Sequence, residues 1–190
     1  MRPKSTSDRD LLLALTALFR EHGFEGTSLS MIAEATGLKR ASLYHRFPEG
    51  KSDMALAVID FTQREFAEVL APLHDSGPVK TRIRRVARNL DEYYEGGLRS
   101  CLIDSLSVGA QPDGSDIVAE RIAQILHDFI GSFAKVAAEA GASPKEARRR
   151  AEDAVIRFEG SLVVARSTRD TSTFKRWMRE LPNLLAGDEG

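Results

Sequence analysis

The pattern of apolar and polar residues predicts α-helices along almost the whole chain. Apolar residues recur three and four positions apart, which is the spacing of the buried face of an amphipathic helix. The first such run places five apolar residues on one broad face, namely Leu11, Leu12, Leu15, Leu18 and Phe19. Ser7 precedes this run as its expected N-cap, and Gly23 is expected to end the helix.

Two short helices are expected next. Ser28 is the predicted N-cap of the second helix, and Gly37 suits the left-handed residue that follows a helix C-terminus. A third helix is expected over residues 39–47, with Leu43 and Phe47 as its buried pair. Two short helices joined by a turn at Gly37, with a longer helix packed against them, predict a helix-turn-helix.

The sequence beyond residue 50 predicts a second all-helical domain. Ser143 and Glu146 form a start signal for one of its helices. We therefore predict an all-α fold of about nine helices, with an N-terminal helix-turn-helix domain at residues 1–50 and a second domain at 51–190. In the second domain, helices are expected over about 51–73, 79–95, 116–141, 143–166 and 171–185, with a short segment at 100–110.

Composition limits the class of protein. With 190 residues, of which 42% are hydrophobic and 29% charged, the chain can bury a core of its own. A single cysteine excludes an internal disulfide and fits a reducing compartment. There is no apolar run long enough to span a membrane, and the first residues lack the apolar centre of a signal peptide. The expected location is the cytoplasm.

Charge is unevenly distributed, although the net charge is only −1. The stretch from Gly37 to Lys51 holds four Lys or Arg side chains and one acid. If Leu43 and Phe47 are buried, helical spacing turns the other side chains of this helix outward. Cations and hydroxyl groups on an exposed helix are suited to the major groove of DNA, where they reach phosphates and base edges. The outward residues are Arg40, Ala41, Tyr44 and His45, with Ser42 at the margin.

Residues 8–60 resemble the N-terminal DNA-binding domain of the tetracycline-repressor (TetR) family of bacterial regulators. The resemblance rests on LFREHGFEGTSLSMIAEATGL (18–38), SLYHRF (42–47) and PEGK (48–51). It implies base contacts from Arg40, Ala41 and Ser42. Arg40 is the candidate for guanine O6 and N7, and Ala41 for a thymine methyl group. It also implies phosphate contacts from Thr27 or Ser28, from Tyr44 and His45, and from Lys51.

The sequence departs from the family pattern at Lys39, which stands where the family usually has a Ser or Thr cap. The third helix should therefore be weakly capped, and Lys39 could supply a phosphate contact instead. The loop PEGK is one residue longer than the commonest form, which affects the aim of Lys51.

The resemblance also implies a homodimer that joins through the last two helices and reads a palindromic operator of double-stranded DNA. A short recognition helix reads few base pairs, so a two-fold dimer is also expected on physical grounds. A small hydrophobic or amphipathic effector would bind in the second domain and release a repressor from DNA. For each candidate pocket residue, simple core packing is the competing interpretation. The candidates are Phe61, Phe66, Tyr93, Tyr94, Cys101, His127, Phe129, Phe133, Phe158 and Trp177.

Other function classes are less well supported. The chain has no Gly-rich phosphate loop, no convincing pair of carboxylates and no nucleophile–base motif, so we expect neither an enzyme nor a cofactor. His22 and His74 lack partners at metal-ligand spacing, and no metal site is expected. The run 148–150 of three arginines is expected to be a solvated helix face. The alternatives left open are a regulator or architectural DNA-binding protein without an effector, and a protein–protein adaptor that has lost DNA binding.

Overall fold

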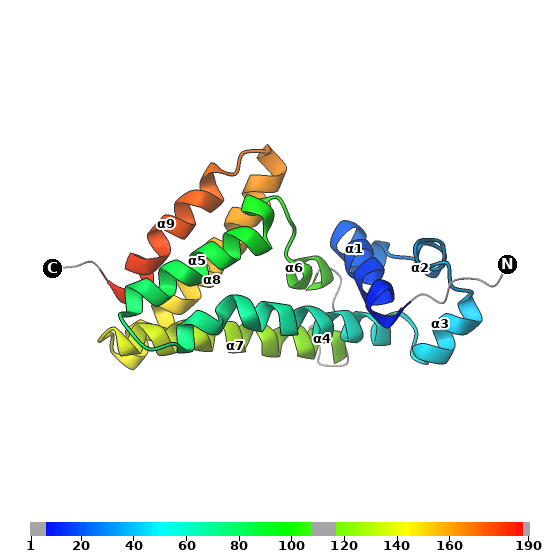
Figure 1. Cartoon of the computed structure of the whole chain (residues 1–190), viewed down its shortest axis with the longest axis horizontal. Helices are drawn as coiled ribbons and strands as arrows, with labels where there is room; N and C mark the ends of the chain where they lie inside the picture. The colour runs from blue at the N-terminus through cyan, green and yellow to red at the C-terminus, as the bar shows by residue number, and fades with distance from the viewer. Residues whose placement is uncertain (1–6, 108–116, 188–190) are drawn as a thin grey trace. The chain divides into compact units, whose positions relative to one another are not determined.

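The computed structural model describes residues 7–107 and 117–187, and within these ranges every regular element is a helix (Figure 1). The all-α prediction is confirmed, although the end of the expected segment 100–110 and the start of the expected helix 116–141 lie outside the described residues. In this described part of the chain, no helix is long and apolar enough to cross a membrane. The α-helices are α1 (Asp8–Gly26), α2 (Leu29–Thr36), α3 (Arg40–Arg46), α4 (Lys51–Leu70), α5 (Val79–Tyr93), α6 (Leu102–Ser107), α7 (Ile117–Glu139), α8 (Pro144–Thr168) and α9 (Ser172–Ala186), and two 3-10 turns are η1 (Ala71–His74) and η2 (Glu95–Gly97).

The chain forms two compact units. The first contains the described residues of Met1–Arg64 and Leu102–Ile122, and the second contains those of Glu65–Cys101 and Ala123–Gly190. Helices α4 and α7 contribute residues to both units. The boundaries of these two units differ from the domain boundary that we expected at residue 50. A functional division at that residue stays a prediction.

The core of the first unit begins with α1. Of the five apolar residues predicted on one face of this helix, Leu11, Leu15 and Phe19 are buried, whereas Leu12 and Leu18 are half-buried. At its start, the Ser7 hydroxyl oxygen accepts a hydrogen bond from the backbone N–H of Asp10 at 3.1 Å. This bond satisfies one of the backbone donors that a helix N-terminus leaves without an intrahelical partner.

Gly23 interrupts α1 where the sequence predicts its end. Its backbone, with φ 69° and ψ −178°, lies in a region that only glycine adopts without strain, and helical residues continue after it to Gly26. Here α1 also packs closely against α6, and a Cβ at Gly23 would lie 3.0 Å from the carbonyl oxygen of Ser105. The hydroxyl group of Ser105 donates in turn to the carbonyl oxygen of Arg20 at 3.4 Å.

The short helices α2 and α3 follow the predicted signals. The Ser28 hydroxyl oxygen accepts from the backbone N–H of Met31 at 3.2 Å, and Gly37 adopts the left-handed conformation with φ 68°. Helix α3 has no side-chain cap at Lys39, which confirms the weak start predicted for it. Leu43 is fully buried, whereas Phe47 is only half-buried and lies just after the helix.

Two helices of the second unit end earlier than predicted. Helix α4 ends at Leu70 rather than near residue 73, because Pro72 lacks a backbone N–H and its ring clashes with the preceding turn. The chain continues there as the 3-10 turn η1. Helix α5 ends at Tyr93 rather than at residue 95, and Gly96 then takes a left-handed conformation with φ 68°.

The start of α8 shows the predicted cap and a neutralised basic face. The Ser143 hydroxyl oxygen accepts from the backbone N–H of Glu146 at 3.3 Å. Glu146 also accepts hydrogen bonds from Arg149 and Arg150, which lower the pKa of its carboxyl group to about 2. Arg148 pairs with Glu152 at 2.5 Å. Arg148 and Arg149 are exposed, as the sequence predicts, whereas Arg150 is half-buried and donates a hydrogen bond to the carbonyl oxygen of Leu185 at 3.3 Å.

We expect Gly23→Ala to destabilise the protein by roughly 1–3 kcal/mol. Alanine is strained in the backbone conformation of Gly23, and its Cβ would lie too close to the carbonyl oxygen of Ser105. The measurement is urea unfolding followed by circular dichroism. Gly26→Ala is the matched control, because its Cβ would make only an ordinary contact, at 3.5 Å from the His22 Cβ. If the two variants lose the same stability, the close approach of α1 and α6 does not require Gly23.

Candidate nucleic-acid interface

The exposed face of α3 carries the side chains that the sequence assigns to base and phosphate contacts. Burial of Leu43 fixes the rotation of this helix about its own axis. All five candidates on the helix are exposed, as the spacing predicts, and Lys39 just before the helix is exposed as well. The five residues are Arg40, Ala41, Ser42, Tyr44 and His45.

The guanidinium group of Arg40 is held against α2. Its Nη2 atom donates a hydrogen bond to the Ser30 hydroxyl oxygen at 2.7 Å. A guanidinium group has five N–H donors, so one such bond leaves most of its donors available. Sequence reasoning missed Ser30, which lies two positions after the cap of α2 and has no sequence signal that connects it with Arg40.

A surface groove of about 530 Å³ lies beside the start of α2. Three of the expected phosphate-contacting residues, Ser28, Tyr44 and Lys51, line it together. Thr27 also borders the groove, but its side chain is 1% exposed and its hydroxyl group donates to the carbonyl oxygen of Gly23 at 2.6 Å. Of the expected pair Thr27 or Ser28, only Ser28 is exposed.

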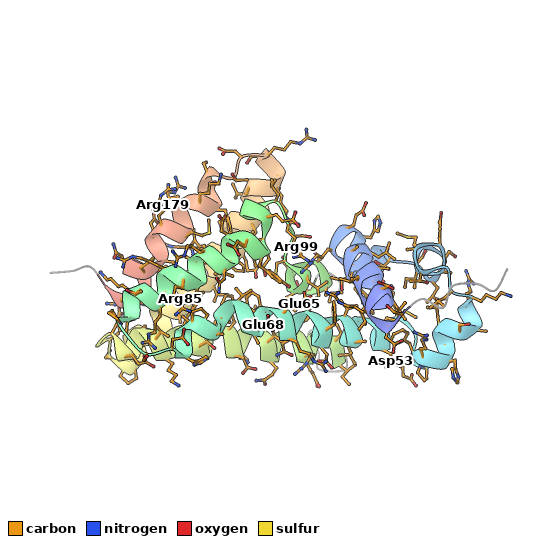
Figure 2. The ribbon with its side chains drawn as sticks, in the orientation of Figure 1. Asp53, Glu65, Glu68, Arg85, Arg99 and Arg179 are labelled. Atoms are coloured by element: carbon orange, nitrogen blue, oxygen red, sulfur yellow. The ribbon has the colours of Figure 1, made fainter. Side chains whose placement is uncertain are left out.

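Lys51 is positioned by two neighbours at the end of α1. Its ammonium nitrogen lies 3.8 Å from Glu25 Oε2 and 4.5 Å from the centre of the Phe24 ring. Both contacts are favourable for a cation. The preceding loop is fixed by Asp53, marked in Figure 2, whose carboxylate accepts from the backbone N–H of Glu49 at 2.8 Å. An anion that binds Lys51 must compete with Glu25.

Arg46 connects α3 to α1. Its Nη1 atom lies 2.6 Å from Asp8 Oδ1. Sequence reasoning gave Arg46 no role. The two residues are 38 positions apart, so no local pattern could pair them.

Most of the candidate effector-pocket residues meet in the second unit. Aromatic rings from α4, α5, α7, α8 and α9 form a connected cluster with centroid separations between 4.8 and 6.5 Å. Sequence reasoning omitted Phe174 from this set, although its spacing from Trp177 on the last helix is the signal that could have included it. The cluster contains Phe66, Tyr93, Tyr94, Phe129, Phe133, Phe158, Phe174 and Trp177.

The adjacent residues Tyr93 and Tyr94 differ in environment. Tyr94 is 4% exposed, and its hydroxyl group donates to the sulfur of Cys101 at 3.9 Å. Burial raises the pKa of the Tyr94 phenol well above its usual value, so this group is neutral at pH 7. Tyr93 is half-buried under Arg99, whose guanidinium carbon lies 4.9 Å from the centre of the ring. Arg99 is labelled in Figure 2.

Two candidate pocket residues lie apart from the aromatic cluster. His127 is exposed on α7, because it precedes the buried Phe129 by two residues and so points to another side of the helix. Phe61 is half-buried and belongs to the first unit. Among the described residues, no group of His, Cys, Asp and Glu side chains is arranged to hold a metal ion.

Comparison with known proteins agrees with this architecture. Residues 11–58 match the family model described as "Bacterial regulatory proteins, tetR family". The HTH-type transcriptional regulator YxaF of Bacillus subtilis is 22% identical over 97% of this chain and 98% of its own length. The HTH-type transcriptional regulator LmrA of Bacillus subtilis is 23% identical over 94% of this chain and 96% of its own.

Solved structures have the same fold along their whole length. A TetR transcriptional regulator from Legionella pneumophila superposes with a TM-score of 0.82, at 22% identity over 97% of this chain and 100% of its own. The regulatory protein TetR from Rhodobacter sphaeroides gives 0.79, at 24% identity over 95% and 99%. The matched segment contains the whole helix-turn-helix described above, and the family consists of regulators rather than enzymes. Residues 11–58 therefore form a DNA-binding domain of the TetR family of transcriptional regulators.

Proposed function

We propose that the protein is a homodimeric transcriptional repressor of the cytoplasm, which binds a palindromic operator and is released by a small hydrophobic or amphipathic effector. The observation that supports DNA binding best is the combination of the exposed α3 face with the groove that Ser28, Tyr44 and Lys51 line. Base-reading groups and phosphate-binding groups thus belong to one unit of the protein.

In this proposal α3 enters the major groove. Arg40 exchanges its bond to Ser30 for the O6 and N7 atoms of a guanine, and Ala41 and Ser42 contact neighbouring base edges. The backbone phosphates are bound by residues around α3. Those residues are Ser28, Lys39, Tyr44, His45 and Lys51.

The first test is binding of the purified protein to the DNA upstream of its own gene, measured across a salt series. We expect Arg40→Ala to weaken binding to the preferred palindrome by about 1–3 kcal/mol and to relax the preference at one base position. Lys51→Ala should instead weaken binding to all sequences and reduce the salt dependence by about one counterion.

Ser30→Ala is the matched control for Arg40, because it removes the partner of the guanidinium group and leaves the group itself. We expect it to keep the affinity and the sequence preference of the wild type. If Ser30→Ala reproduces the effect of Arg40→Ala, then Arg40 acts by supporting α2, and the proposal that it reads a base is wrong.

The homodimer is supported by an apolar stripe on the outer face of α8. Ile156, Val163 and Val164 are 69%, 41% and 43% exposed. Gly160 lies between them, and a Cβ there would meet nothing within 4 Å. Exposed apolar residues on one helical face, with a glycine that permits close approach, suit packing against a second copy of the helix.

Helix α9 is firmly attached to α8 and would join the same interface. The indole N–H of Trp177 donates to the carbonyl oxygen of Ala154 at 3.1 Å, and Arg157 lies 3.6 Å from Glu180. A dimer built on this pair of helices would carry two copies of α3, as a palindromic operator requires.

We expect the double substitution Ile156→Asp/Val163→Asp to produce a monomer, because each dimer would bury four uncompensated carboxylates. Analytical ultracentrifugation measures the change in mass. Leu98→Asp is the control, since Leu98 is 58% exposed in the same unit but lies outside α8. A double variant that remains dimeric would contradict the proposed interface.

The effector would bind at the aromatic cluster, where the rings of Phe66, Tyr93 and Phe129 meet. Phe66 and Tyr93 are only half-buried, so this side of the cluster is the one open to a ligand. A ligand that prefers the conformation unable to bind DNA lowers operator affinity about tenfold for each 1.4 kcal/mol of that preference.

Trp177 is the only tryptophan of the chain and lies in this cluster, so its fluorescence reports on ligand binding. In a panel of aromatic hydrophobic compounds, we expect those that change Trp177 emission also to weaken operator binding. Phe129→Leu, inside the cluster, should reduce both effects, whereas Phe61→Leu should leave them unchanged. Compounds that bind the cluster without changing operator affinity would favour the alternative, a DNA-binding regulator without an effector.

A further inference from the structure

A second groove, of about 520 Å³, lies on the second unit between α5 and α9. Each helix lines it with residues at spacings of three and four, which place them on one face. From α5 these are Arg84, Ala87, Arg88 and Asp91, and from α9 they are Lys175, Met178, Arg179 and Pro182. This groove contains none of the aromatic rings of the proposed effector site.

The groove is strongly cationic. Four of its residues carry a positive charge, and Asp91 is the single acid among them. All four cationic residues are exposed. Figure 2 marks one of them, Arg179, on α9. Like charges this close repel one another unless an anion lies between them.

These cations lack the partners that other arginines of the same unit have. Arg84, Arg88, Lys175 and Arg179 make no ion pair or side-chain hydrogen bond with the described part of the chain, although the charge of Lys175 contributes to lowering the pKa of the Asp170 carboxyl group. Six other arginines of the unit are each paired with an acidic side chain. The paired arginines are Arg82, Arg85, Arg148, Arg149, Arg150 and Arg157.

The remaining surface of the groove is apolar. Ala87 and Pro182 are buried, and Met178 is half-buried between the charged rims. The volume falls within the range of pockets that hold organic molecules of moderate size. The ligand must therefore offer both several negative charges and an apolar body.

We propose that this groove binds an organic diphosphate of about the size of a nucleotide. The planar guanidinium groups of Arg84, Arg88 and Arg179 match phosphate oxygens and can bind them with paired hydrogen bonds. Three arginines and a lysine against one aspartate suit the roughly three negative charges of a diphosphate at neutral pH. The organic part then covers Met178 and Pro182.

The groove lies on the side of α9 away from the proposed dimer interface. Trp177 and Glu180 face α8, as their contacts with Ala154 and Arg157 show. Residues 175, 178, 179 and 182 face α5 instead. The proposal is therefore independent of the operator, of the dimer and of the hydrophobic effector.

The test is isothermal titration of the full-length protein with inorganic pyrophosphate, ADP and citrate at constant ionic strength. We expect pyrophosphate to bind, ADP to bind more tightly because of its organic part, and citrate to bind more weakly than pyrophosphate. The double substitution Arg88→Gln/Arg179→Gln should weaken binding of both phosphate ligands by about tenfold or more. Both side chains are exposed, so circular dichroism should show an intact fold.

Two further variants make the test specific. Arg176→Gln removes an exposed arginine from α9 outside the groove, and should change binding by less than about twofold. Asp91→Asn removes the single acid, whose Oδ1 atom is buried without a hydrogen-bond partner, and should tighten pyrophosphate binding.

Several results would overturn the proposal. The first is no binding of pyrophosphate or ADP at millimolar concentration, and the second is an equal effect of Arg176→Gln. If citrate binds as tightly as pyrophosphate, the groove is a site for multivalent anions in general and is not specific for phosphate. If ADP binds no more tightly than pyrophosphate, the organic part of the ligand does not contact the groove. If the double variant weakens DNA binding as much as Lys51→Ala does, the groove is a DNA surface instead.

Discussion

The burial of Leu43 is the constraint on which the DNA-binding surface depends. Helix α3 has seven residues and no side-chain cap, and so short a helix is not stable in water by itself. Packing of Leu43 in the core of the first unit and the Arg46–Asp8 ion pair hold it in place. The same packing turns Arg40 and Tyr44 to the surface, so stability and recognition come from opposite faces of one helix.

The parts of the fold that could be predicted from the sequence are those with local signals. Ser7, Ser28 and Ser143 cap helices as expected, and the apolar spacing identified the buried face of α1 and of α3. Partners far apart in sequence could not be predicted. The bonds of Arg40 to Ser30 and of Arg46 to Asp8 depend on how the helices pack.

The groove between α5 and α9 also could not be predicted from the sequence. Each stripe of residues is visible in the sequence as a spacing of three and four, but it could equally be a solvated helix face, as the arginines of α8 are. What distinguishes the two cases is the presence of acidic partners. Arg149 forms ion pairs with Glu146 and Asp153. Arg88 on α5 and Arg179 on α9 line the groove from opposite helices and have no acidic partner among the described residues.

The contact between Ser105 and Arg20 has a consequence for the order in which the protein folds during synthesis. These residues are 85 positions apart, and α6 belongs to the same compact unit as the helix-turn-helix. A ribosome that has released only the first hundred residues has therefore not yet released the segment that completes this unit. At about 5–20 residues per second, the nascent chain spends several seconds with the α6-facing side of α1 uncovered. For the same reason, a fragment truncated after α4 would expose that side permanently.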